Sequence, residues 1–226
     1  MSWTTGIDWT APAGVALKRL FAELPQDREF QITLFGSSPL QIGLEKSFLS
    51  ADVDMFSADE DTEVVRAAVH RAGLEKAEGR LYVEVCVQWN FRTSPRWSER
   101  AFRTQVGNVA LTLPHPIDIL IAKLHRLADK DLAAFRLVIA RMGHPTEDEM
   151  RRELQIAVDL FRPNFDEEMI GDITTNTRVL WQELWGKDIN VRQEIIAPAV
   201  ALRNKGYLEQ MAREPYSDQL RKASES

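Results

Sequence analysis

Hydrophobic positions change their spacing several times in the first half of the chain, which predicts alternating strands and helices. Residues 81–89 form the clearest predicted strand, because every second side chain from Leu81 to Val87 is aliphatic. Further strands are expected at 30–35, 52–56, 105–106 and 109–113, the last two joined by a Gly-Asn turn. Helices are expected at 14–24, from residue 39 and at 59–72. This part therefore predicts a mixed sheet of about four or five strands with helices packed against it.

After residue 115 the hydrophobic pattern becomes helical throughout. Apolar residues recur at helical spacing, and one such stripe contains Trp181 and Trp185. Glycine and proline interrupt the pattern and divide it into helices at roughly 117–130, 132–142, 146–161, 166–186 and 190–213. The fold class is therefore predicted as α+β, with a mixed-sheet domain at 1–115 followed by an all-helical domain at 116–226.

Composition narrows the class of protein. The chain has 226 residues, of which 44% are hydrophobic. Its net charge of −6 argues against a protein that coats nucleic acid without sequence preference. We expect neither a signal peptide nor a membrane span, because no apolar run is long enough. Cys86 is the single cysteine, so no intrachain disulfide can form and a cytoplasmic protein is expected. We interpret Cys86 as a small buried residue rather than a nucleophile.

Two short polar motifs could carry chemistry. Asp52 and Asp54 are two residues apart on a predicted strand, so their carboxylates point to the same side. Like charges so close repel unless a cation lies between them, and oxygen ligands suit Mg²⁺. Gly36 ends the preceding strand, where backbone N–H groups could receive a phosphate, and Ser37 and Ser38 add hydroxyls. Each motif alone is also typical of a capped turn or of solvated carboxylates, but their order predicts phosphoryl transfer.

The residues of these motifs resemble a known signature. The run LFGSS at 34–38, followed by SADVDM at 50–55, resembles the nucleotidyltransferase superfamily with the polymerase-beta-like fold. A second run, HPIDILIAKLHR at 115–126 followed by DKD at 129–131, is similar to an element of bacterial abortive-infection and toxin-type nucleotidyltransferases. The resemblance implies transfer of a nucleotidyl group from a nucleoside triphosphate to a hydroxyl acceptor, with Mg²⁺ as cofactor.

The resemblance also implies roles for individual residues. Gly36 and Ser37, with Ser38 beside them, would hold the triphosphate, and Asp52 and Asp54 would bind the metal and act in catalysis. Such proteins take a third carboxylate from a later strand. Glu84 is the candidate for this catalytic and metal-binding position, and a surface glutamate on a half-exposed sheet is an equal alternative.

A lysine and an aspartate of the helical half complete the implied site. The resemblance assigns Lys123 to the nucleotide or the acceptor and maps a second position to Asp131. Lys123 borders the apolar stripe of its predicted helix, a position that by itself favours a surface lysine with a partly buried stem. The resemblance implies instead that its ammonium faces the paired aspartates and that its removal leaves the fold intact. Ala134 stands where related proteins often carry an aspartate, a departure that favours the alternative of a catalytically silent module that binds nucleotide or a partner protein. A third alternative is an unrelated α/β domain.

The acceptor is left open among RNA, a protein side chain and a small molecule. Four arginines with aromatic residues between them recur at three- to four-residue spacing: Arg92, Arg96, Arg100 and Arg103. On one helix they would share a face that could bind RNA phosphates or stack on bases. Pro95 interrupts such a helix, and a solvated basic face explains the same pattern.

Overall fold

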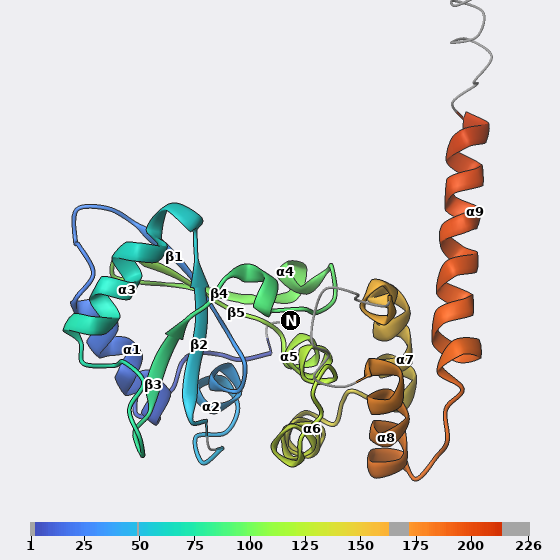
Figure 1. Ribbon diagram of the computed structural model, residues 1–226, viewed down its shortest axis with the longest axis horizontal. Coiled ribbons are helices and arrows are strands. Elements are labelled where there is room, and N and C mark those ends of the chain that lie inside the picture. The colour runs from blue at the N-terminus through green and yellow to red at the C-terminus, as the bar shows by residue number, and fades with distance from the viewer. Residues whose placement is uncertain (1–2, 49, 163–171, 214–226) are drawn as a thin grey trace, which may run out of the picture.

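Five strands from the first 113 residues form one mixed sheet, as the alternating pattern predicts. The computed structural model describes residues 3–48, 50–162 and 172–213, the last seven of these by their backbone alone (Figure 1). The strands are β1 (Phe30–Phe35), β2 (Asp52–Ser57), β3 (Tyr82–Val85), β4 (Phe102–Val106) and β5 (Val109–Leu113). Their order is β3-β2-β1-β5-β4, with β1 antiparallel to β2, and with β3 parallel to β2 and β5 parallel to β1. A hairpin turn at Gly107 and Asn108 makes β4 antiparallel to β5.

Two helices cover one face of this sheet. They are α1 (Pro12–Ala22) and α3 (Thr62–Arg71), which lie on the same side in Figure 1. Val53 and Met55 of β2 are fully buried in the core that these helices form with the sheet. Because side chains alternate along a strand, the residues between them project to the other face. That face carries Asp52 and Asp54.

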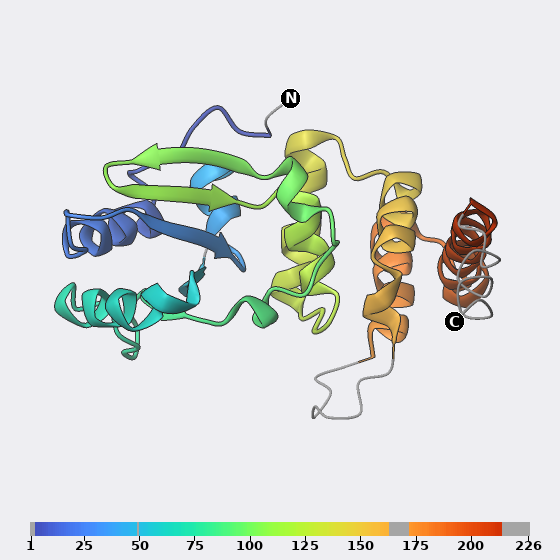
Figure 2. The same cartoon turned by 90° about the horizontal axis from the view of Figure 1, so that it is seen from above.

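The described part of the chain after residue 115 is largely helical, as predicted, and residues 166–171 of the helix expected at 166–186 lie outside the described residues. Its helices are α5 (Pro116–Lys123), α6 (Asp129–Met142), α7 (Glu147–Ile156), α8 (Ile173–Trp185) and α9 (Ala197–Arg213), with a π-helical turn at Arg192–Ile196. They surround a second hydrophobic core, in which Trp181 is fully buried and lies 4.7 Å from Trp185 between ring centroids, as the predicted stripe requires. In Figures 1 and 2, α9 stands apart from the other helices of this half. Every helix among the described residues is too short or too polar to cross a membrane.

The two cores separate near residue 115. Residues 11–113 supply the first core, whereas the second takes its members from residue 117 onward and from Leu40 of α2 (Ser38–Gly43). The sheet part thus contributes one short helix to the helical core. The division into domains at 1–115 and 116–226 stays a prediction.

Several predicted elements differ in extent from the observed ones, and three of them bear on the site. The strand expected at 81–89 ends at Val85, because β3 lies at the sheet edge with β2 as its partner, and Cys86 N–H makes the last bond to Met55 O at 2.8 Å. The chain then turns through Gln88–Asn90. The helix expected at 117–130 ends at Lys123, and the helix expected from 132 begins at Asp129. Asp131 causes this early start, because its carboxylate accepts the Ala128 N–H at 3.0 Å.

Candidate metal centre

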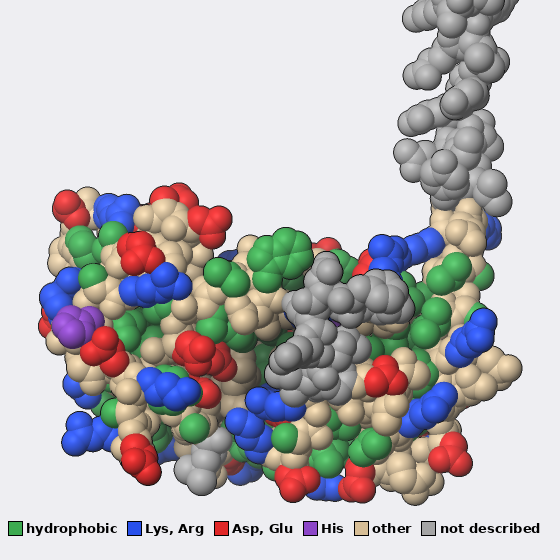
Figure 3. All heavy atoms as spheres, in the orientation of Figure 1, with side chains coloured by type: hydrophobic (Ala, Val, Ile, Leu, Met, Phe, Trp, Pro, Cys, Tyr) green, Lys and Arg blue, Asp and Glu red, His purple; other side chains and the backbone are tan. Residues whose placement is uncertain are grey.

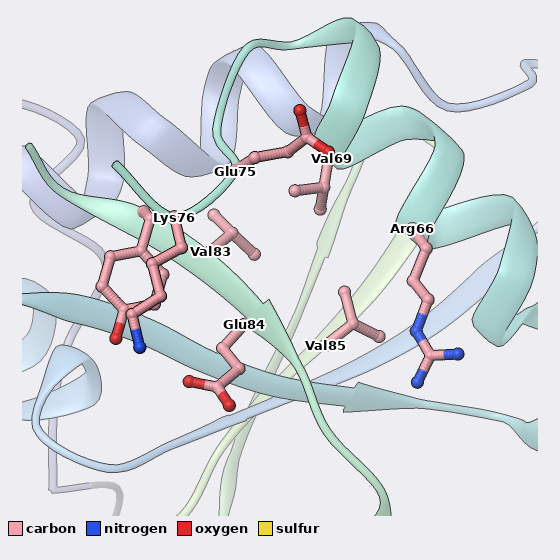
Figure 4. Close-up of a pocket in the computed structure, with 8 residues that line it drawn as sticks. Arg66, Val69, Glu75, Lys76, Val83, Glu84 and Val85 are labelled. Carbon is pink, nitrogen blue, oxygen red and sulfur yellow. The ribbon is translucent and has the colours of Figure 1, made fainter. Parts of the chain in front are cut away.

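The open face of the sheet brings three carboxylates together. Asp52 and Asp54 project from β2, and Glu84 pairs with Asp54 in the parallel register of β2 and β3. Paired residues of adjacent strands share a face, and Figure 4 shows Glu84 on the opposite side of β3 from Val83 and Val85. One oxygen of each carboxylate lies within 4.8 Å of the others. All three carboxylates proposed from the sequence therefore form one cluster, here called the acidic triad.

The acidic triad has the electrostatics of a cation site. Burial raises the pKa of Asp54 to about 7, and the charges of Asp52 and Glu84 act in the same direction. Tyr82 donates its hydroxyl to Asp52 Oδ2 at 3.3 Å, which holds that carboxylate in place. A divalent cation would relieve this crowding of negative charge, and the all-oxygen set fits the preference of Mg²⁺. The three side chains thus fit the metal that the sequence predicts.

The Gly-Ser turn lies directly against the acidic triad. Gly36 has a φ of +65°, and a Cβ atom there would lie 2.0 Å from Asp54 Oδ2. Only glycine therefore lets the backbone approach the carboxylate so closely. Ser37 and Ser38 differ in what their hydroxyls do. Ser37 Oγ accepts from Lys123 Nζ at 2.9 Å, whereas Ser38 is fully buried and donates to Phe35 O at 3.3 Å.

The hydroxyl of Ser38 is thus engaged within the turn itself. The short helix α2 begins at Ser38 rather than at residue 39, and Ser37 before it makes no side-chain cap bond. The Ser37 hydroxyl accepts a hydrogen bond from Lys123 instead.

Lys123 connects the turn to the helical half. Its side chain is buried, and its ammonium binds Ser37 Oγ and, at 3.0 Å, Asp131 Oδ1. The positive charge of Lys123 acts on Asp54, where it lowers the pKa against the effect of burial. Burial lowers the pKa of the ammonium, and Asp131 acts in the opposite direction. The ammonium therefore contacts Ser37 and Asp131 and acts on Asp54 through its charge, and its buried ion pair makes it part of the fold.

Sequence reasoning missed two cations near the acidic triad. Arg126 binds both oxygens of Asp131 at 2.9 Å, and that bond, followed by the negative charges of Asp131, Asp52 and Asp54, raises its pKa. Lys130 also lowers the pKa of Asp54. Both lie in the run at 115–126 and 129–131, so the sequence contained a signal for these two cations. The chain turns after Lys123, and this turn brings Arg126 and Lys130 toward the acidic triad. A single helix over 117–130, as expected, does not contain this turn. Figure 3 shows acidic and basic side chains interspersed over the face of the molecule that it draws.

The four arginines do not form one helical face. The helix α4 spans only Trp97–Arg100, because Pro95 precedes it, and Arg103 belongs to β4. Arg100 donates to both oxygens of Asp118 at 2.7 Å and pairs with Glu153 at 2.8 Å, so it is a structural residue. Arg96 pairs with Glu99 on the surface.

Cys86 has no features of a nucleophile. The side chain is half-buried rather than fully buried. Burial and then the negative charges of the acidic triad raise its pKa to about 12, so the thiol stays protonated at neutral pH.

Comparisons with known proteins add no identification. Neither a protein-family model, nor a curated protein, nor a solved structure matches this chain. The site is therefore interpreted from its own residues.

Proposed function

We propose that this protein transfers a nucleotidyl group from a nucleoside triphosphate to a hydroxyl acceptor, with Mg²⁺ as cofactor. The observation that carries the proposal is the acidic triad, in which Asp52, Asp54 and Glu84 approach within 4.8 Å beside the Gly36 turn. A cluster of carboxylates next to an open glycine backbone suits a metal-bound phosphate chain. The motifs at 34–38 and 50–55 support the same assignment through their resemblance to the nucleotidyltransferase superfamily.

In this proposal the acidic and the basic residues have different roles. Asp52, Asp54 and Glu84 would hold Mg²⁺, which when bound supplies activation of the hydroxyl and neutralisation of charge at phosphorus. Glu84 is the most exposed of the three, so it is the one suited to accept the proton of the acceptor hydroxyl.

Two cationic residues would orient the phosphate chain. Lys123 and Arg126 lie at the end of α5 and after it, where their charges act on the aspartates. Gly36 would let the phosphates approach the metal along its backbone. We place this activity in the cytoplasm, in keeping with the single cysteine.

Calorimetric titration with ATP and the other nucleoside triphosphates, with and without Mg²⁺, tests the proposal. We expect binding that depends on Mg²⁺ and a rise in melting temperature that Asp52→Asn abolishes. Asp59→Asn is the matched control, because Asp59 is an exposed carboxylate outside the acidic triad. Transfer of label from an α-labelled triphosphate then separates an enzyme from a silent module. Absence of any Mg²⁺ response in the wild type would refute the enzyme and favour the silent module.

A further inference from the structure

A cavity of about 410 Å³ lies beside the turn that follows β3. Six residues line it: Gln88, Trp89, Phe91, Arg92, Thr93 and Leu160. Trp89 is 87% exposed, whereas Trp181 of the helical core is fully buried. An indole left in solvent at the rim of a cavity is typical of a binding site, because its large apolar face gains free energy only when a ligand covers it.

The cavity adjoins a cluster of aromatic side chains that lies next to the acidic triad. Phe91 lines the cavity and packs against Phe35, with 5.6 Å between ring centroids. Phe35 in turn pairs with Asp54 across β1 and β2. Cys86, two residues after Glu84, packs against the same aromatic rings. One layer of aromatic side chains therefore separates the cavity from the carboxylates.

The lining combines a flat aromatic surface with hydrogen-bonding groups. The indole of Trp89 offers a face for stacking, and Gln88 and Arg92 place an amide and a guanidinium at the same cavity. Thr93 donates to Asp118 O at 2.6 Å, which attaches this wall to the buried start of α5. The volume lies within the range of small-ligand sites. A planar ring with polar edges has the matching chemistry.

We propose that this cavity binds a nucleobase, with Trp89 as the stacking surface. The inference rests on the proposed nucleotidyl transfer and extends it, because it assigns the base of the nucleotide to a place separate from the phosphates. The base belongs either to the donor triphosphate or to the terminal nucleotide of an RNA acceptor. Stacking of a base on an aromatic side chain tolerates every base, so we expect Trp89 to contribute affinity rather than base selectivity.

The test compares ligands with and without a base. Affinities for ATP, inorganic tripolyphosphate and a short single-stranded oligoribonucleotide are measured in Mg²⁺ for Trp89→Ala, Trp89→Phe and the wild type. We expect Trp89→Ala to weaken ATP or the oligoribonucleotide on the order of 10-fold, to leave tripolyphosphate unchanged, and Trp89→Phe to retain most of the affinity. Leu202→Ala, at a 67% exposed apolar residue on α9, is the control and should change nothing.

The pattern of losses identifies the source of the base. A loss for ATP assigns the cavity to the donor, and a loss confined to the oligoribonucleotide assigns it to the acceptor. Unchanged affinities in Trp89→Ala overturn the inference, and if Asp52→Asn still abolishes Mg²⁺-dependent ATP binding, the proposed function stands without it. If Asp52→Asn has no effect while Trp89→Ala weakens ATP, the cavity binds the base and the proposed function fails.

Discussion

Gly36 is the residue at which a side chain would be least tolerated. Its φ of +65° and the distance of 2.0 Å from an added Cβ to Asp54 Oδ2 both exclude one. We expect Gly36→Ala to lower the free energy of unfolding by about 1–2 kcal/mol through the left-handed backbone, and also to displace the Asp54 carboxylate and weaken Mg²⁺. Urea denaturation and Mg²⁺ titration measure the two effects.

Gly186→Ala provides the matched control for this substitution. Gly186 has a φ of +62° with nothing within 4 Å of an added Cβ. It should lose stability through the backbone alone and keep the Mg²⁺ affinity of the wild type. Equal Mg²⁺ affinities in both alanine variants would contradict the role assigned to the Gly36 turn.

Asp54 makes the stability of the metal-free protein depend on pH. Its pKa rises from 3.8 to about 7 on folding, chiefly through burial and then through Asp52 and Glu84. The protonated carboxyl therefore contributes stability that is complete below pH 3.8 and is lost as the pH rises through about 7. The loss amounts to at most about 4 kcal/mol. Because Mg²⁺ competes with the proton, its affinity should increase over the same range.

The difference between wild type and Asp54→Asn isolates this effect. Asparagine does not titrate, so the free energies of unfolding of the two proteins, measured without metal from pH 4 to 8, should diverge in favour of the variant as the pH rises. Parallel profiles would show that Asp54 is ionised throughout.

At the scale of elements, local patterns were sufficient for the strands and insufficient for their ends. The strand predicted at 30–35 is β1, because its alternation and the glycine after it are properties of neighbouring residues. The end of β3 depends instead on how far β2 extends beside it, and the start of α6 depends on the carboxylate of Asp131. Both boundaries depend on contacts between residues that the hydrophobic periodicity does not relate to each other. The positions of Arg126 and Trp89 were missed for the same reason.

The junction of α5 and α6 depends on Asp131. Its side chain is fully buried and accepts from Lys123, Arg126 and the Ala128 N–H. Asp131→Ala leaves the Lys123 ammonium buried without its counter-ion, so we expect a loss of about 3–5 kcal/mol in the free energy of unfolding. Arg126→Ala is the control, because Arg126 is 48% exposed and leaves the buried pair intact, and it should cost no more than about 1 kcal/mol. Similar losses in the two variants would contradict the burial of the pair.

At the scale of the whole molecule, one buried ion network joins the sheet part to the helical half. Arg100 of α4 binds Asp118 of α5, which is fully buried, and Glu153 of α7. Arg100→Ala leaves Asp118 unpaired and should lower the free energy of unfolding by about 3–5 kcal/mol.

Arg96→Ala serves as the control for the network, because Arg96 and Glu99 form an exposed pair that contributes about 1 kcal/mol or less. Guanidinium denaturation of both variants measures the difference. A mild effect at Arg100 would show that apolar packing alone holds the two parts together.

The assembly of the candidate site was predictable only in part. The spacing of Asp52 and Asp54 puts both on one face wherever their strand lies. The place of Glu84 required the register of β2 and β3, which no local pattern determines. The contribution of Lys123 to the fold became clear only when Asp131 was found beside it.

The position of β3 at a sheet edge affects how often Glu84 lies beside the two aspartates. It is one of the two edge strands of the sheet, bonded to β2 alone among the described strands, yet it carries Glu84. Edge strands open more often than central ones, so the third carboxylate leaves its partners each time β3 detaches, and the acidic triad is complete for only a fraction of the time. A cation that bridges Glu84 to β2 would close this opening. We therefore expect Mg²⁺ to slow hydrogen exchange at the amides of β3 far more than at those of β5. Glu84→Gln should remove this slowing. Equal exchange of β3 with and without Mg²⁺ would mean that Glu84 does not bind the cation.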